Sequence, residues 1–255
     1  MPTVHRLNIA AVRSLALETR DEIDLTESGV AEDRRFYLIG DDGRMVDQIM
    51  VPGLVRIRTW SDPGATVLRL TFPDGTVVED RVRTGDPTET AIYSRVSAGH
   101  VVDGPWAEAL TRYAGRSIRV VRCDQAGGTW ATDEAVTLVT DGSLEAIGAA
   151  LGVETLDARR FRMLIELEGG APHEEDTWAG RRIGLGETIL RVGAPVPRCP
   201  ITTHDPGTGE RDLDTLRAIK DYRGISGKKD LLFGVWAEVE RPGRIRLGDA
   251  VTILD

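Results

Sequence analysis

The sequence predicts a mostly β protein with a few short helices. Short apolar runs recur between turn signals, and 28 glycines punctuate the 255-residue chain. Little helical periodicity separates these runs, and strands spaced this closely are typical of barrels and sandwiches. The length has room for one large domain or two small ones, since about 150 residues per domain is common.

The strand candidates follow in chain order. Residues 36–39 precede a Gly-Asp-Asp-Gly turn and a short apolar pair, which predicts a hairpin. The run 67–72, a Pro-Asp-Gly turn and the run 76–78 predict a second hairpin. Further strands are expected at residues 117–122, 135–139, 163–167, 188–192, 232–239 and 250–254.

Three helices are expected between these strands. The stretch 103–115 has proline near its start and glycine at its end, and the stretch 143–151 is followed by glycine. Residues 212–222 place leucine and isoleucine on one face, with Asp212 or Asp214 as the cap. Because the first helix lies near mid-chain, we expect a domain of residues 1–105 and a second of residues 106–255.

Composition excludes several classes of protein. The net charge of −9 argues against a general nucleic-acid-binding surface, although the basic residues are almost all arginine. No apolar run approaches the roughly 18 residues of a membrane span, and no signal peptide is visible, so we expect a cytoplasmic protein. Only Cys123 and Cys199 are present, which excludes a disulfide framework, a four-cysteine zinc site and an iron–sulfur cluster held by four cysteines of one chain.

The segment around Cys199 is the strongest candidate for chemistry. No dinucleotide-binding loop, phosphate-binding loop or nucleophile elbow occurs in the chain. Prolines at 195, 197 and 200 restrict the backbone around Cys199, and the adjacent Arg198 favours a thiolate. Packing and chemistry remain open alternatives, because a lone cysteine is most often a small core residue. We expect Cys123, in a strand, to be such a core residue.

The chain resembles a known family in this segment. Residues 198–209 read Arg-Cys-Pro-Ile-Thr-Thr-His-Asp-Pro-Gly-Thr-Gly and precede a leucine-bearing helix. They resemble the cysteine motif of MOSC (molybdenum cofactor sulfurase C-terminal) domain proteins, most closely the mitochondrial amidoxime-reducing component branch. Arg160-Phe-Arg162 is similar to the family's phosphate-binding segment. Upstream, Ala11-Val-Arg-Ser14 and Asp33-Arg-Arg-Phe-Tyr37 resemble parts of the MOSC N-terminal β-barrel domain.

The resemblance implies a MOSC β-barrel, an N-terminal β-barrel-like domain and a bound molybdenum cofactor (Mo-molybdopterin). Cys199 would be the catalytic residue and the protein's ligand to molybdenum, beside the dithiolene sulfurs of the pterin. The remaining cofactor-binding residues that it implies are Arg13, Ser14, Arg35, Arg162, Arg198, Thr202 and Thr203. One departure is Arg162-Met-Leu164, which stands where the amidoxime branch has Arg-Pro-Asn.

The resemblance implies an oxidoreductase that reduces N-hydroxylated small molecules, such as amidoximes or hydroxylamines. Because this chain cannot hold a four-cysteine cluster, the electrons would come from a separate flavoprotein, ferredoxin or cytochrome. No nucleic acid or membrane partner is expected. One alternative is a non-redox carrier of sulfur or of the sulfurated cofactor, and another is an interaction protein built on a degenerate barrel.

Overall fold

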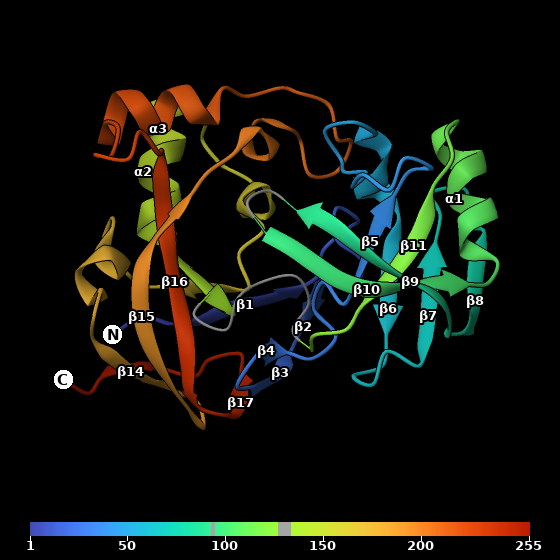
Figure 1. Ribbon diagram of the computed structural model, residues 1–255. Helices are drawn as coiled ribbons and strands as arrows, with labels where there is room; N and C mark the ends of the chain where they lie inside the picture. The colour runs from blue at the N-terminus through green and yellow to red at the C-terminus, as the bar shows by residue number, and fades with distance from the viewer. Residues whose placement is uncertain (93–94, 127–133) are drawn as a thin grey trace.

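The computed structural model describes residues 1–92, 95–126 and 134–255. Within these ranges the secondary structure is mostly β, with three α-helices and several short 3-10 turns. The predicted fold class is therefore confirmed. Figure 1 shows the strands gathered into two lobes, with both chain termini in the same lobe. No α-helix in the described ranges is long and apolar enough to cross a bilayer.

The larger lobe, called the barrel lobe here, is built on one eight-stranded sheet in the order β18-β14-β15-β16-β12-β13-β1-β2. The Val4 amide donates to the Asp249 carbonyl at 2.9 Å, and the Val251 amide donates to the Pro2 carbonyl at 2.9 Å. These bonds join β1 to the start of β18, so the sheet closes on itself as a barrel. Its strands are β1 (Thr3–Ile9), β2 (Glu18–Arg20), β12 (Val136–Thr140), β13 (Ile165–Glu168), β14 (Arg182–Leu185), β15 (Thr188–Pro197), β16 (Leu232–Arg241) and β18 (Val251–Ile253).

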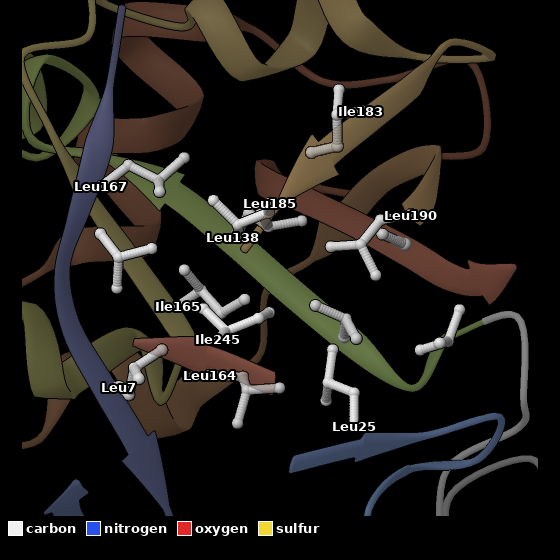
Figure 2. Close-up of a cluster of buried hydrophobic side chains, with 14 of the residues drawn as sticks. Leu7, Leu25, Leu138, Leu164, Ile165, Leu167, Ile183, Leu185, Leu190 and Ile245 are labelled. Atoms are coloured by element: carbon white, nitrogen blue, oxygen red, sulfur yellow. The ribbon is translucent and has the colours of Figure 1, made fainter. Parts of the chain in front are cut away.

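Inward-facing aliphatic side chains fill this barrel, and Figure 2 shows them pointing toward one another. Leu7 of β1, Leu138 of β12 and Leu190 of β15 are fully buried in the same cluster. A small sheet of β3 (Glu22–Thr26), β4 (Gly29–Val30) and β17 (Gly243–Arg246) adds further side chains to it. Burial of this kind contributes about 25 cal/mol for each Å² of apolar surface removed from water.

The second lobe, called the smaller lobe here, has its own core of Phe36, Leu54, Leu68 and Trp106 with their neighbours. Two sheets surround that core, in the orders β5-β11-β10-β9 and β6-β7-β8. The strands are β5 (Phe36–Ile39), β6 (Arg58–Ser61), β7 (Val67–Thr71), β8 (Val77–Arg81), β9 (Arg83–Ile92), β10 (Arg95–Asp103) and β11 (Arg119–Cys123). Both predicted hairpins are confirmed, at 36–46 and at 67–81.

The lobes do not divide the chain at one position. Strand β1 belongs to the barrel, although it begins the chain, while α1 (Trp106–Ala114) and β11 pack in the smaller lobe. The division into domains of residues 1–105 and 106–255 stays a prediction, and the sheets cross it. This interleaving places loops of both lobes next to each other.

The three α-helices form where turn and capping residues predict them. Helix α1 ends at Gly115 and α2 (Asp141–Leu151) ends at Gly152, each in the left-handed conformation that favours glycine. Helix α2 connects the parallel strands β12 and β13. Helix α3 (Thr215–Arg223) begins after Asp214, whose side chain accepts the Arg217 amide.

Strands β9 and β10 were not predicted. Strand β9 is polar and contains Pro87 and Gly85, which weaken strand propensity. It lies at the edge of its sheet, where a proline without an amide hydrogen is tolerated. The hairpin that it forms with β10 runs toward the barrel lobe in Figure 1.

Gly209 lets the loop after Cys199 pack on the smaller lobe. Its φ is +80°, and a Cβ at this position would lie 1.9 Å from the carbonyl oxygen of Pro52. Pro52 begins the 3-10 turn η1 (Pro52–Arg56). A residue with a side chain would both strain the backbone and separate the two segments.

We predict that Gly209→Ala lowers the free energy of unfolding by about 2 kcal/mol or more, from left-handed strain plus overpacking. Gly207→Ala, in the same turn, is the control, because its Cβ would meet only the Asp205 carboxylate at 3.3 Å. Urea denaturation of the three proteins measures the difference. Equal effects of the two substitutions would show that the contact with Pro52 is unimportant.

Candidate functional site

A cavity of about 370 Å³ lies where the two lobes meet. Loops after β1 and before β5, the β9–β10 hairpin, the segment before β13 and the loop after β15 all contribute to its wall. The polar lining residues are Arg13, Ser14, Arg34, Gln48, Arg95, Glu134, Thr137, Arg160, Arg162, Arg198, Cys199 and Thr202.

Arginine dominates the polar part of this wall. Six arginines but a single carboxylate, Glu134, line the cavity within the described ranges. Three of these arginines are paired with carboxylates, Arg34 with Asp33, Arg95 with Glu134 and Arg160 with Asp212, and these pairs balance part of the positive charge. A protein with a net charge of −9 that gathers cations here is suited to an anionic ligand.

Three of the lining residues have a left-handed backbone. The φ angles are 71° at Ser14, 50° at Arg34 and 51° at Arg162. Each such residue costs about 1–2 kcal/mol relative to the ordinary right-handed or extended conformation. Strain of this kind concentrates at functional sites, because the surrounding structure must hold it in place.

Hydrogen bonds between the lobes hold two of these residues, Arg34 and Arg162. The Asp33 carboxylate accepts the Ala10 amide at 2.7 Å and pairs with the Arg34 guanidinium. Arg34 Nη2 donates to the carbonyl of Arg162 at 2.9 Å, and Arg162 Nη2 donates to the carbonyl of Leu15 at 2.9 Å. The two arginine segments therefore orient each other before any ligand binds.

Cys199 opens into the cavity between two rigid pieces of chain. It follows the end of β15 at Pro197, and Pro200 begins the short turn η5 (Pro200–Thr203) directly after it. Cys199 itself is extended, half-buried and not in a disulfide. Its proline neighbours restrict the backbone, as the sequence predicts.

Arg198 is held beside Cys199 by neutral groups. Its Nη2 donates to the Phe161 carbonyl, Nη1 lies 3.5 Å from the Met163 sulfur, and the guanidinium lies 5.2 Å from the Phe161 ring centroid. Burial lowers the pKa of Arg198 to about 10; the Cys199 sulfur opposes this shift and Arg34 adds to it. The group remains protonated at neutral pH. Its buried Nε has no hydrogen-bond partner among the described residues.

Arg160 joins the two segments that carry Arg162 and Cys199. It lies in the turn η3 (Ala158–Phe161), and its side chain is only 4% exposed. Nη1 donates to Asp212 at 2.7 Å, Nη2 pairs with the same carboxylate, and Asp205 lies 3.6 Å away. Both acids belong to the chain between Cys199 and α3. This bidentate pair therefore sets the position of the cysteine loop.

Of the residues predicted for the site, the structure brings Arg13, Ser14, Arg162, Arg198, Cys199 and Thr202 to the cavity. Arg35 and Thr203 are not among its lining residues. The Arg35 carbonyl accepts the Cys123 amide at 2.9 Å, and burial lowers the pKa of its side chain. Thr203 donates to the Pro200 carbonyl at 2.7 Å and so closes η5. Their cofactor-binding roles stay predictions.

Sequence reasoning missed Arg34 and Gln48. Arg34 lies one position before Arg35 and faces the cavity, and the Asp-Arg pair that begins the segment was the available signal. Gln48 is 4% exposed and its Oε1 has no hydrogen-bond partner among the described residues. No local pattern marks Gln48, which an otherwise ordinary loop carries into the cavity.

Cys123 is a core residue, as predicted. It is 2% exposed and packs with Tyr37, Ile39 and Val121, with its sulfur 3.3 Å from the Ser97 hydroxyl. In the described parts of the chain, no three or more His, Cys, Asp or Glu side chains gather as a metal site.

Comparison with known proteins agrees with the architecture. The model of a family described as the MOSC domain matches residues 125–252, and that of the MOSC N-terminal beta barrel domain matches residues 1–103. The YUAD protein from Bacillus subtilis, a solved structure, is 13% identical with a TM-score of 0.46, covering 98% of this chain and 93% of that one. A TM-score this low supports no conclusion.

Curated relatives fall into two groups. Molybdenum cofactor sulfurase of Caenorhabditis briggsae is 26% identical over 98% of this chain and 36% of its own length, so the chain spans about a third of that protein. Mitochondrial amidoxime reducing component 2 of Homo sapiens is 29% identical over 98% of this chain and 82% of its own length. Mitochondrial amidoxime-reducing component 1 of Mus musculus is 24% identical over 99% of this chain and 82% of its own length.

We predict that Asp212→Asn lowers the free energy of unfolding at pH 7 by about 1–3 kcal/mol, because it removes the main partner of a buried guanidinium. The Arg160 hydrogen bonds lower the pKa of Asp212 below its ordinary value of 3.8. The stabilisation is thus present above that value and is lost as the pH falls through the lower folded value. Denaturation at several pH values measures this loss.

Asp221→Asn is the control for that experiment. Asp221 is 64% exposed and lies 3.4 Å from Arg217 on α3, so its removal should cost no more than about 0.5 kcal/mol. If both variants lose the same stability, the Arg160 pair does not hold the loop.

We predict that Gln48→Leu raises the free energy of unfolding of ligand-free protein by about 1 kcal/mol, because it removes a buried amide oxygen without a hydrogen-bond partner among the described residues. With ligand bound in the cavity the gain should disappear, since the amide then has a partner. Thr59→Val is the control: the Thr59 hydroxyl is buried and unpaired outside the cavity, so its gain should persist. A Gln48→Leu gain unchanged by ligand would contradict this role.

Proposed function

The chain belongs to the MOSC domain family, and on that premise we propose that it binds the molybdenum cofactor in the cavity and reduces N-hydroxylated small molecules there. Its relatives include proteins named molybdenum cofactor sulfurase and mitochondrial amidoxime reducing component. A function related to the molybdenum cofactor therefore follows for this chain. The reductase activity and its substrate class are the proposal.

One observation carries it: the Cys199 thiol opens into a cavity whose wall also holds Arg13, Arg162 and Arg198. A molybdenum cofactor has two chemically different ends, a soft metal centre and an anionic phosphate. Thiolate sulfur suits the first, and guanidinium groups bind the second through paired hydrogen bonds. The cavity presents both donor types.

The unsatisfied groups of the wall fit the same ligand. The buried Nε of Arg198 and the buried Oε1 of Gln48 have no hydrogen-bond partners among the described residues. Groups of this kind cost about 1–3 kcal/mol each when they are left unpaired. A ligand rich in phosphate oxygens and heterocyclic nitrogens offers hydrogen-bond partners to both.

When bound, the cofactor supplies a centre that takes up oxygen and exchanges electrons. The chain's own residues bind and orient it. Uncharged carbonyl oxygens orient the guanidinium groups of Arg162 and Arg198, and the positive charge of Arg198 would attract the anionic end. Apolar side chains of Phe161 and Met163 line the same cavity and exclude water from it.

A reductase also needs a source of electrons. Two cysteines, one of them buried in the core, cannot hold a four-cysteine cluster. We therefore propose a separate donor of the flavoprotein, ferredoxin or cytochrome class.

A carrier of sulfur or of the sulfurated cofactor is the second candidate. The match to the sulfurases of Caenorhabditis briggsae and Caenorhabditis elegans favours it, as does the half-buried free thiol of Cys199 at the cavity wall. The two candidates differ in what happens at Cys199: metal ligation in the reductase, transient persulfide in the carrier.

We predict that protein purified from a host that makes the cofactor contains molybdenum and pterin, and that Cys199→Ser lowers the molybdenum content at least about tenfold. Serine preserves size but replaces a soft sulfur with a hard oxygen. Metal analysis and pterin fluorescence measure the two components. Cys123→Ser is the matched control and should retain the metal.

Activity then separates the two candidates. The loaded protein should reduce benzamidoxime to benzamidine with an added flavoprotein donor, and Cys199→Ser should not. Cyanide-labile sulfur on Cys199, with no reduction, would favour the carrier. Wild type and variant that both lack molybdenum would contradict cofactor binding altogether.

A further inference from the structure

The single carboxylate of the cavity wall binds a guanidinium. Glu134 Oε2 lies 2.6 Å from Nη2 of Arg95, and both residues line the cavity. Within the described ranges no other Asp or Glu lines it. Glu134 is therefore the one position on this wall that favours a cation.

An apolar surface lies beside this pair. Arg95 and Ile92 are directly opposite each other across the β9–β10 hairpin, so their side chains leave the same face of the sheet. Both line the cavity, and Ile92 is only 4% exposed. A ligand that reaches Glu134 thus finds a carboxylate that binds a planar cation, with the apolar side chain of Ile92 beside it.

The Arg95 head group is a planar N–C–N cation whose nitrogens donate hydrogen bonds to carboxylate oxygens. Amidines and guanidines have the same arrangement of atoms. The Arg95 side chain is 38% exposed, so its guanidinium can move into solvent when another cation binds Glu134. Such an exchange leaves the total charge of the cavity unchanged, whereas an anion at Glu134 would meet repulsion.

We propose that Glu134 selects ligands with a cationic N–C–N head group, by taking them in exchange for Arg95. This inference rests on the proposed reductase function for its class of compound: N-hydroxyguanidines as cationic substrates, and guanidines and amidines as cationic products. Hydroxamic acids, which have no N–C–N group, and anionic N-hydroxylated compounds are disfavoured.

The chemistry of the reduction agrees with this choice. An amidoxime takes two electrons from the separate donor protein and two protons from water; its N–O bond breaks, and an amidine and one water form. The amidine is a strong base and takes a third proton to become an amidinium. Glu134 holds that cation through a charge-assisted hydrogen bond.

Benzamidine and benzamide test the inference, because they differ by an amidinium nitrogen in place of an uncharged oxygen. Calorimetric titration of the cofactor-loaded protein should show benzamidine binding at least about tenfold more tightly. Glu134→Gln should abolish that preference. Arg95→Gln should strengthen benzamidine binding, since the competing guanidinium is gone. Glu168→Gln, an exposed carboxylate outside the cavity, is the control and should behave as wild type.

Several results would overturn the inference: equal binding of the two compounds to wild type, a preference that survives Glu134→Gln, or weaker benzamidine binding in Arg95→Gln. Benzamidoxime reduction, measured on the same preparations, keeps the two proposals apart. If the protein reduces benzamidoxime but Glu134→Gln leaves benzamidine binding unchanged, this inference is wrong and the reductase function stands. Glu134-dependent binding without reduction defeats the reductase function and leaves the cation site standing.

Discussion

The guanidinium of Arg198 is buried against Phe161, and its hydrogen bond goes to an uncharged carbonyl oxygen. Arg162 likewise donates to a carbonyl, that of Leu15. Neutral acceptors fix the direction of a guanidinium without cancelling its charge. Arg198 therefore keeps its positive charge in a buried position, where charge interactions are strong. Such a buried charge is unfavourable by itself, and an anionic ligand relieves it.

The rest of the structure supplies the rigidity that this arrangement requires. The barrel places the segment of Arg160 and Arg162 beside the cysteine loop, and the pair between Arg160 and Asp212 joins them. Gly209 then seats that loop against Pro52 of the smaller lobe. The strained residues Arg34 and Arg162 are held by hydrogen bonds between the lobes. The strained backbone and unpaired polar groups at the cavity thus lower the stability of the fold, and apolar burial in the two cores offsets this loss. Such a distribution is common at functional sites.

Local features of the chain predicted much of this. Turn glycines and capping residues located the helices, and three prolines around Cys199 marked the loop that opens into the cavity. Contacts between residues far apart in the sequence determine the features that local patterns did not predict. Arg34 rather than Arg35 reaches the cavity because of a left-handed φ of 50°, which tertiary hydrogen bonds impose. Gln48 is buried only because the lobes meet around it, and β1 closes a barrel formed by residues far along the chain.

The central claim is that Cys199 provides the protein ligand to a molybdenum centre held by the arginine wall. X-ray absorption at the molybdenum edge, on protein purified from a cofactor-producing host, tests it most directly, because it counts the sulfur ligands of the metal. We expect one sulfur beyond those of the pterin, replaced by a lighter atom in any Cys199→Ser protein that retains metal. A sulfur count that is the same in both proteins would contradict it.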